Sequence, residues 1–274
     1  MLELPECYHI AKQLSDNLVG KKIKKVIAND TPHKMAWYYE DDPSNYHKLL
    51  RYRIIRKVNA FGSMIEISAG RSRILLSDGV VVNYYQPGDV VKPKHQLYIE
   101  MTDGSKLVCN VIMYGSLFVF LNKQNKNPYY LIAKAKPSPL SISFDQTYFN
   151  SLMNEAKPTL NLKAFLATEQ RIPGLGNGVL QDILFVAKLN PKRKLTNLDD
   201  EEKFDLFRAI KDTLAMMAKM GGRDTEFDIF GNPGGYLTIL SNESKDRPCP
   251  RCRGMIVKEA FMGGSIYYCE SCQK

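Results

Sequence analysis

Four cysteines near the end of the chain have the types and spacing of a metal site. Cys249 and Cys252 form one Cys-x-x-Cys pair, Cys269 and Cys272 form another, and sixteen residues separate the two pairs. This separation is typical of a tetrahedral zinc site, because each pair supplies two thiolates from one tight turn. Two disulfides would use the same cysteines. We expect one structural zinc ion (Zn2+) instead, because no secretory leader precedes the chain.

The segment between the two cysteine pairs is predicted to form a β-hairpin. Strand-like arms at 255–257 and 266–268 flank the turn-forming glycines Gly263 and Gly264. A module of about 30 residues has almost no hydrophobic core, so the metal ion would drive its folding. The basic residues of this region favour a phosphate-rich partner; they are Lys245, Arg247, Arg251, Arg253, Lys258 and Lys274.

A glycine-rich turn between two helical patterns is the second candidate site. It reads Gly174-Leu-Gly-Asn-Gly178, and its glycines permit positive φ angles and close approach of another backbone. We expect a helix to begin after Asn177, so that its first N–H groups and the Asn177 amide form an anion-binding corner. A tight turn between two helices explains the pattern equally well. Lys192 and Arg193 follow soon after and would line the same nucleic-acid backbone.

The composition bounds the class of protein. The chain has 274 residues, with 38 Lys and Arg against 29 Asp and Glu and a formal net charge of +9. A basic protein with a zinc hairpin favours a nucleic-acid partner, although an enzyme with a solvated positive face has the same composition. No apolar run reaches about 18 residues, so no membrane span is expected. Cys7 and Cys109 are interpreted as reduced thiols, which suits a cytoplasmic protein.

The first half of the chain is predicted to be an antiparallel β-sandwich preceded by one helix. Apolar residues from Cys7 to Leu18 recur at helical spacing, and Gly20 can end that helix. Turn signals punctuate the strand-rich stretch that follows. The expected strands are 22–28, 63–68, 74–76, 79–85, 96–101, 107–112 and 116–121, with one short helix near 44–52.

The second half is predicted to be helical up to the zinc hairpin. A Pro- and Lys-rich linker at 134–140 precedes apolar stripes at helical spacing, and the longest of these stripes ends at Gly221-Gly222. A glycine-rich loop follows at 223–236. We therefore expect three domains, with bounds 1–133, 134–240 and 241–274.

These features together resemble one known family. The opening Met-Leu-Glu-Leu-Pro-Glu, the turn ending at Asn177, the segment 231–236 and the four-cysteine hairpin are similar to those of formamidopyrimidine-DNA glycosylase and endonuclease VIII. The resemblance implies an α+β multidomain fold: an N-terminal antiparallel β-sandwich, a helix-two-turn-helix domain and a C-terminal four-cysteine zinc-finger hairpin. It also implies that double-stranded DNA, damaged or distorted, lies in the cleft between the lobes.

The resemblance implies a chemistry as well. Members of this family act in base-excision repair: they turn a damaged base out of the duplex, and the amine of the mature N-terminal residue attacks C1′ to form a Schiff base. This amine would belong to Met1 or, after removal of Met1, to Leu2. Glu3 falls on the proton-handling position and Glu6 on a second family glutamate. The plain alternatives are a solvated Glu3 and a Glu6 that serves only the helix N-terminus.

The resemblance further implies which residues contact DNA. Asn177 falls on the phosphate-contacting asparagine, and Met113 and Tyr114 fall on the wedge that fills the vacated base position. The remaining expected contacts are Gln170, Gly176, Lys192, Arg193, Lys94 and Arg253. The protein would act as a monomer in the bacterial cytoplasm, associated with the nucleoid.

Several positions depart from the family pattern. Leu2 replaces the usual proline, the segment 59–63 lacks the usual lysine, Val81 takes the place of an intercalating methionine, and Gly264 replaces an arginine. Three readings stay open: a glycosylase with AP lyase activity, a catalytically inactive protein that binds distorted DNA, and a scaffold for protein interaction. The loop 223–236 is where the family holds the everted base, with Asp224, Thr225 and Glu226 as candidate contacts; a mobile surface loop is the alternative.

Overall fold

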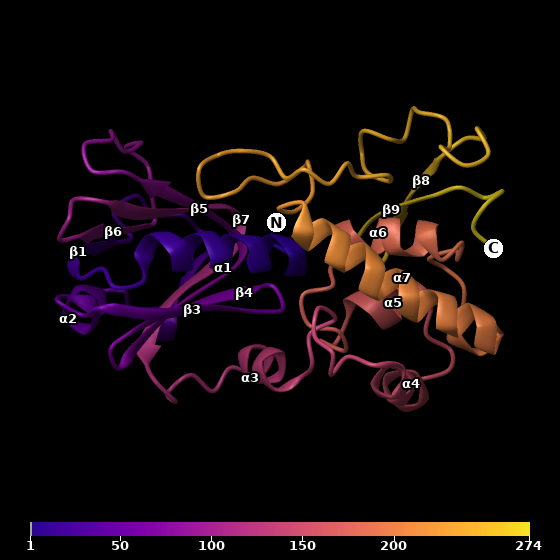
Figure 1. Cartoon of the computed structure of the whole chain (residues 1–274), viewed down its shortest axis with the longest axis horizontal. Coiled ribbons are helices and arrows are strands. Elements are labelled where there is room, and N and C mark those ends of the chain that lie inside the picture. Colours follow the sequence, from indigo (N-terminus) through magenta and orange to yellow (C-terminus); the bar gives the residue numbers. More distant parts are fainter. Residues whose placement is uncertain (1) are drawn as a thin grey trace.

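The molecule is elongated, with a β-rich lobe and a helical lobe joined near its middle (Figure 1). The computed structural model describes residues 2–274. Met1, one of the two residues predicted to supply the nucleophilic amine, lies outside the described residues. The amino end lies where the two lobes meet, and the C-terminal hairpin covers the helical lobe.

The β-rich lobe is the predicted antiparallel sandwich, built on two long strands that both of its layers share. Its strands are β1 (Ile23–Ala28), β2 (Ala36–Tyr38), β3 (Ile55–Phe61), β4 (Met64–Ala69), β5 (Ser72–Tyr85), β6 (Leu97–Met101) and β7 (Lys106–Leu121). The order is β1-β6-β7-β5-β4-β3, with β2 parallel to β7. Residues 80–85 of β5 pair with the part of β7 that also pairs with β6. Residues 72–77 of β5 lie between the other part of β7 and β4.

A bend divides each long strand between the two layers. The register of β5 against β7 shifts between Asp78 and Val80, and a Cβ at Gly79 would lie 2.6 Å from the Tyr114 carbonyl oxygen. Turn-like residues at this bend explain why the sequence predicted four separate strands where the structure has two. The sequence analysis also missed β3, because its Arg, Lys and Asn residues leave it with little apolar alternation.

Helices cover both sides of the sandwich. The predicted first helix is confirmed as α1 (Leu4–Leu18), and its apolar stripe packs on β3 and β4. The short α2 (Tyr46–Leu50) confirms the helix expected near 44–52. A further helix, α3 (Pro128–Ala135), was not predicted; its Tyr130 and Ala133 pack against Phe120 on the sandwich.

The helical lobe contains the four predicted helices. They are α4 (Gln146–Glu155), α5 (Leu162–Ala167), α6 (Asn177–Val186) and α7 (Asp200–Lys219), with a 3-10 turn at Leu195–Asn197. Side-chain caps fix where three of them begin: the Asp145, Asn161 and Asp199 carboxylate or amide oxygens accept backbone N–H groups of the first turns of α4, α5 and α7. Within residues 2–274, no helix combines the length and apolarity needed to cross a bilayer.

The C-terminal hairpin consists of β8 (Val257–Phe261) and β9 (Gly264–Tyr268). The arm predicted at 266–268 lies within β9. The arm predicted at 255–257 was placed too early: β8 begins only at Val257, and Met255, which precedes it, is 86% exposed. The hairpin docks on α6, where the Gln181 side chain accepts the Tyr267 N–H at 3.1 Å and donates to the Ser265 carbonyl oxygen at 3.2 Å. This docking brings the hairpin turn to the start of α6.

The loop 223–236 joins the two lobes, and we call it the interlobe strap. It leaves α7, crosses to the β-rich lobe and returns (Figure 1). Ile229 is buried in the sandwich core, its carbonyl oxygen accepts the Tyr84 N–H at 2.8 Å, and Gln13 of α1 donates to Asp228. The alternative of a mobile surface loop is therefore wrong: this segment is anchored on both lobes.

The two lobes also touch through glycines. A Cβ at Gly174 would lie 2.3 Å from the Gly62 carbonyl carbon, and the Gly174 φ is +82°. We expect Gly174→Ala to lower the free energy of unfolding by roughly 2–5 kcal/mol, because left-handed strain and overpacking add together. Gly20→Ala is the matched control, since Gly20 has a φ of +89° but no atom within 4 Å of its Cβ position. Equal losses for the two variants in chemical denaturation would contradict the proposed close contact.

Candidate functional site

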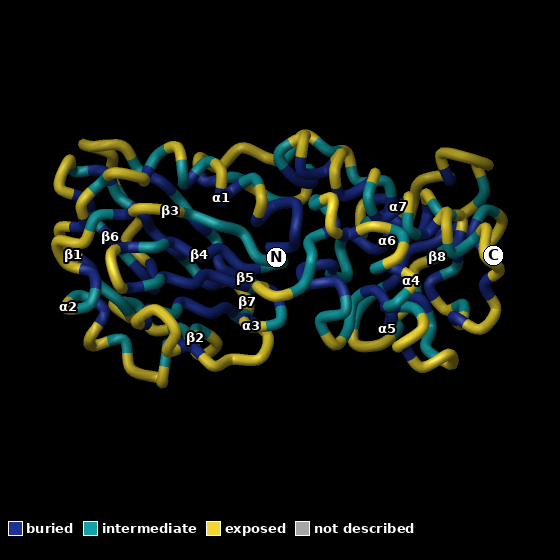
Figure 2. The backbone as a smooth tube through the Cα atoms, turned by 60° about the horizontal axis from the view of Figure 1, so that its bottom comes forward, coloured by how far each residue is buried: buried dark blue, intermediate teal, exposed yellow. Residues whose placement is uncertain are grey.

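A pocket of about 460 Å³ opens where the amino end, the glycine turn and the hairpin turn meet. Its lining includes Leu2, Glu3, Asp78, Tyr114, Lys163, Asn177 and Gly264. Figure 2 shows the amino end between the lobes, with buried backbone on either side of it. Segments far apart in sequence thus meet in one cavity, and the predicted proton-handling residue lies in it.

Glu3 is buried, not solvated, and its carboxylate caps α6. The Gly178 N–H donates to Glu3 Oε1 and the Val179 N–H donates to Glu3 Oε2, both at 2.8 Å. Burial raises the pKa of Glu3, while Arg223 and the two N–H groups act in the opposite direction. The alternative of a solvated Glu3 is therefore excluded.

The glycine turn serves this carboxylate. The sequence analysis assigned the first N–H groups of α6 to an external anion, but two of them already bind Glu3. A Cβ at Gly176 would lie 2.6 Å from Glu3 Oε1, so only glycine lets the carboxylate approach. The predicted anion-binding corner is thus real, but its anion is a residue of the chain itself.

Glu6 lies behind Glu3 and is paired with Arg223. The Arg223 backbone N–H and Nε donate to Glu6 Oε1 at 3.1 and 3.0 Å, and Nη2 donates to Oε2 at 3.1 Å. Burial alone would raise the pKa of Glu6, but the Arg223 charge and hydrogen bonds bring that pKa below its ordinary value. Glu6 also accepts the Glu3 N–H at 3.2 Å, so its helix-terminal role and its pairing role coexist.

Leu2 lies at the edge of the same pocket. Its backbone N–H donates to the Asp78 carbonyl oxygen at 3.0 Å, and its side chain is buried in the sandwich core. The Asp78 backbone has a φ of +62°. Asp78 also lines the pocket, and its carboxyl group accepts a hydrogen bond from the Ser77 hydroxyl. Burial raises the pKa of Asp78. A second carboxyl group therefore stands beside Glu3, at a position that the sequence analysis did not consider.

The hairpin turn closes the other side of the pocket. The Asn177 side chain donates to the Ser265 carbonyl oxygen at 3.0 Å, and the Lys163 ammonium donates to the Phe261 carbonyl oxygen at 2.5 Å. A Cβ at Gly264 would lie 3.5 Å from Lys163 Nζ and 3.6 Å from Asn177 Nδ2. The glycine that replaces an expected arginine thus faces a lysine. Lys163 was missed because it lies within an apolar helical stripe.

Aromatic and apolar residues form the wall on the sandwich side. Tyr114 lines the pocket and its ring centroid lies 5.6 Å from that of Trp37 on β2. Met113, beside it, is 59% exposed. Val81, by contrast, lies half-buried within the paired part of β5, opposite Asn110, so it is not available as a wedge. Trp37 had not been considered, and its parallel pairing with β7 is what places it here.

The four C-terminal cysteines come together as predicted. Their sulfur atoms all lie within 4.8 Å of one another, with Cys249 and Cys272 at 3.8 Å and Cys252 and Cys269 at 3.5 Å. A disulfide requires about 2.05 Å, whereas a tetrahedral zinc site with Zn–S bonds of about 2.3 Å places its sulfurs near these separations. The Gly254 N–H lowers the pKa of the Cys252 thiol to about 7, which favours the thiolate form. The cluster is able to bind a metal ion.

Comparison with known proteins agrees with this arrangement. The chain is 27% identical to formamidopyrimidine-DNA glycosylase of Rickettsia bellii and 28% identical to that of Streptococcus thermophilus, and both alignments cover 100% of each chain. It superposes on the MutM (Fpg) protein of Thermus thermophilus with a TM-score of 0.82 at 22% identity, covering 99% of this chain and 98% of that one. It superposes on the Lactococcus lactis Fpg in complex with abasic-site DNA with a TM-score of 0.83 at 23% identity, covering 99% of both chains. No family model matches the chain.

The chain is similar over its whole length to formamidopyrimidine-DNA glycosylases, and it has their fold. Both sequence alignments span the whole chain, including the regions of the glycine turn and the C-terminal hairpin.

The structure does not bring all of the expected DNA contacts of this glycosylase family to the pocket. Lys192 pairs with Glu259 at 2.7 Å, and Arg193 forms two hydrogen bonds with Glu202. Lys94 and Arg253 are exposed and do not line the pocket. Gln170 and Gly176 do line it. The roles of all these residues in binding DNA stay predictions.

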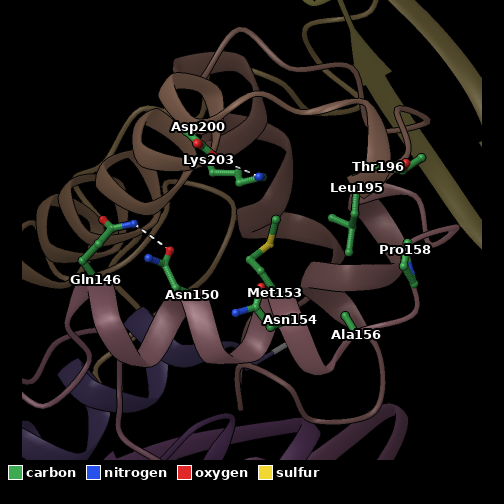
Figure 3. Close-up of a pocket in the computed structure, with 10 residues that line it drawn as sticks. All are labelled: Gln146, Asn150, Met153, Asn154, Ala156, Pro158, Leu195, Thr196, Asp200 and Lys203. Atoms are coloured by element: carbon green, nitrogen blue, oxygen red, sulfur yellow. Dashed lines mark hydrogen bonds and ion pairs between the residues drawn. The ribbon is translucent and has the colours of Figure 1, made fainter.

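A second hollow lies on the helical lobe and shares no residue with the central pocket (Figure 3). It has a volume of about 500 Å³ and lies between α4 and the start of α7. Lys203 pairs with Asp200 and Gln146 donates to Asn150, both at 2.9 Å. Because its two charged residues pair with each other, it offers no free acid or base. The central pocket remains the candidate site.

Proposed function

We propose that this chain is a damaged-DNA-binding glycosylase with AP lyase activity, acting on oxidised bases or abasic sites in duplex DNA. The observation that carries the proposal is the buried Glu3 carboxylate at the end of a pocket that Asn177 and the hairpin turn also line. Relatives in the same family have been solved with abasic-site DNA and with Fapy-dG DNA, both from Lactococcus lactis. Their ligands are the ones that this proposal assigns to the pocket.

The proposed chemistry needs three parts. A base must leave the stack, because its glycosidic carbon is unreachable within the duplex. Glu3 then transfers protons at the sugar, and burial raises its pKa above the ordinary value, which favours its role as a proton donor. An N-terminal amine attacks C1′, and the bond from C1′ to the base breaks. The C1′–O4′ bond then breaks as O4′ takes up a proton, which gives the Schiff base that permits strand elimination. Removal of Met1 would place this amine on Leu2, which lines the pocket beside Glu3.

We assign the wedge to Tyr114 and Met113. Tyr114 contacts Trp37 in a tilted ring pair, and Met113, the neighbouring residue, is exposed. Stacking of a base on an aromatic ring contributes about 1–3 kcal/mol in nucleic-acid complexes. These two side chains would fill the space that the everted base leaves.

We further infer that the metal ion of the four-cysteine cluster is zinc. Cys249, Cys252, Cys269 and Cys272 would hold it in a closed tetrahedral site, which is typical of structural zinc. The ion would stabilise the hairpin whose turn accepts hydrogen bonds from Asn177 and Lys163. It takes no part in the proposed reaction.

A catalytically inactive DNA-binding protein is the second candidate. It is favoured by the Leu2 N–H, which donates to Asp78 in the described structure. An amide nitrogen in a peptide bond is not a nucleophile, because its lone pair is delocalised. If Met1 is retained, the free amine is displaced from the pocket by one residue, and such a misplacement is severe at reacting distances near 3 Å.

Borohydride trapping on abasic-site duplex distinguishes the two candidates. The glycosylase is expected to give a covalent protein–DNA adduct that disappears when the N-terminal amine is chemically blocked, and intact mass will show whether Met1 has been removed. A duplex retained without any adduct would support the inactive binder. Trp37 is the single tryptophan of the chain, so its fluorescence reports binding at the Tyr114 wall in the same samples. No salt-dependent retention of DNA at all would contradict both candidates.

A further inference from the structure

Arg223 is almost completely buried among acidic residues, between the helical lobe and the amino end. Its side chain is 4% exposed, and it begins the interlobe strap directly after Gly221 and Gly222. Both of these glycines have positive φ angles, +84° and +101°, which turn the chain from the end of α7 back toward α1. The turn thereby delivers a guanidinium group to the carboxylates of α1.

The guanidinium joins both glutamates of the amino end. It binds Glu6 in a two-point arrangement, with Nε and Nη2 at 3.0 and 3.1 Å from the two carboxylate oxygens. Nη2 also lies 3.9 Å from Glu3 Oε2 and 3.9 Å from Glu226 Oε1. One cation therefore lies close to three acidic groups, two at the start of α1 and one in the interlobe strap.

The first turn of α6 is shaped around this guanidinium. A Cβ at Gly178 would lie 1.7 Å from Arg223 Nη1, a distance that no side chain can tolerate. Gly176 makes the matching space for Glu3 Oε1. The two glycines on either side of Asn177 thus accommodate an internal carboxylate and an internal guanidinium, which is a more specific role than that of a flexible turn.

Without this cation the site would be electrostatically unfavourable. Two carboxylates buried close together cannot both stay ionised, so one of them would take up a proton. Arg223 reduces this conflict, and the two pKa values shift in opposite directions: burial raises the pKa of Glu3, and the Arg223 charge and hydrogen bonds lower that of Glu6. Environments that separate the pKa values of two acids are typical of acid–base sites.

We propose that Arg223 is a positioning residue of this site: it holds the Glu3 carboxylate against the first turn of α6 and keeps Glu3 and Glu6 together in one buried cluster. The proposal deepens the proposed glycosylase function and rests on it for any effect on rate. Arg223 does not line the central pocket; it acts through Glu3. Because it also begins the interlobe strap, the same residue links the segment that contacts both lobes to the geometry of the site.

The test is a titration of Glu3 in full-length protein with 13C-labelled glutamate carboxyl groups. The Glu3 signal is assigned by its loss in Glu3→Gln, and Glu6 and Glu226 are followed in the same spectra because they face the same guanidinium. Arg223→Met is expected to raise the pKa of Glu3 by about one to three pH units, since an opposite charge at 4–6 Å has an effect of this size. Arg223→Lys keeps a positive charge, so the pKa of Glu3 is expected to rise less in this variant than in Arg223→Met. Arg208→Met, on the exposed face of α7, is the matched control and should leave the Glu3 pKa unchanged.

A second pair of variants covers the case in which Arg223→Met does not fold. Gly178→Ala should displace the guanidinium and raise the Glu3 pKa, and adding Arg223→Lys should partly reverse that effect, because the slimmer lysine leaves room for the new methyl group. If the effects of Gly178→Ala and Arg223→Lys on the pKa of Glu3 simply added in the double variant, the proposal would be overturned. So would an unchanged Glu3 pKa in every folded variant.

Activity separates this inference from the function on which it rests. If the wild type releases bases, the limb of the pH–rate profile that follows Glu3 should move to higher pH in Arg223→Met by the same amount as the NMR titration. A lower rate with an unmoved profile would mean that Arg223 is only structural. If the wild type neither releases bases nor forms an adduct, the proposed function fails, and the NMR titration still decides the role of Arg223.

Discussion

Glu3→Gln is expected to reduce base release by about 10²- to 10⁴-fold, the usual contribution of a positioned acid–base group. The carboxylate is buried beside the pocket and accepts two N–H groups of α6. A glutamine has only one acceptor oxygen, so one of these N–H groups loses its partner as well. The measurement is single-turnover cleavage of duplex DNA that contains an oxidised base, with borohydride trapping of the same reactions.

The loss of a helix contact must be separated from the loss of chemistry. An unpaired buried N–H costs about 1–3 kcal/mol, so Glu3→Gln should also lower the melting temperature. Assays well below that temperature, together with Glu100→Gln as a surface control on β6, isolate the chemical step. Retained binding of an abasic-site analogue with lost cleavage fits the proposed role. Wild-type cleavage by Glu3→Gln would rule Glu3 out as the proton-handling residue.

Removal of the metal ion, or Cys269→Ser, is expected to unfold the C-terminal hairpin and abolish specific DNA binding. Metal binding contributes about 10–16 kcal/mol of apparent free energy to small zinc modules, more than the hairpin's few core residues can replace. Loss of the hairpin also removes the Ser265 partner of Asn177 and the Phe261 partner of Lys163. The site would therefore lose one wall.

Metal analysis, circular dichroism and DNA retention at fixed salt measure this effect. One zinc ion per chain should be found in the wild type and none in Cys269→Ser. Ser271→Ala is the control, because Ser271 is exposed between the last two cysteines and its side chain has no ligand role. Full DNA binding by metal-free protein would show that the hairpin is not part of the interface.

Local sequence patterns predicted most elements of the fold. Apolar spacing identified α1 and the helices of the second half, and the cysteine spacing identified the cluster that the structure assembles. The errors fall where local patterns are weak. The bends of β5 and β7 look like turns in sequence, and β3 carries too many polar residues to look like a strand.

The candidate site was only partly predictable. Glu3, Asn177 and Tyr114 were identified from the resemblance, and all three line the pocket. Asp78, Lys163 and Arg223 were not, because each reaches the site from a different segment whose local sequence gives no sign of it. The partner of Arg223 is Glu6, 217 residues away in sequence. A contact between residues so far apart in sequence depends on how the two lobes pack, and a local sequence pattern does not predict it.

The sequence by itself indicated the family resemblance, the cysteine cluster and most of the helices and strands, because these depend on residue types at short spacing. The tertiary structure alone decided what the glycine turn binds. Helix N–H groups attract any anion that can reach them, and only the packing of the amino end against α6 brings Glu3 within 2.8 Å. The same packing buries Arg223 between two glutamates, and the free energy of a buried charge depends on every group around it.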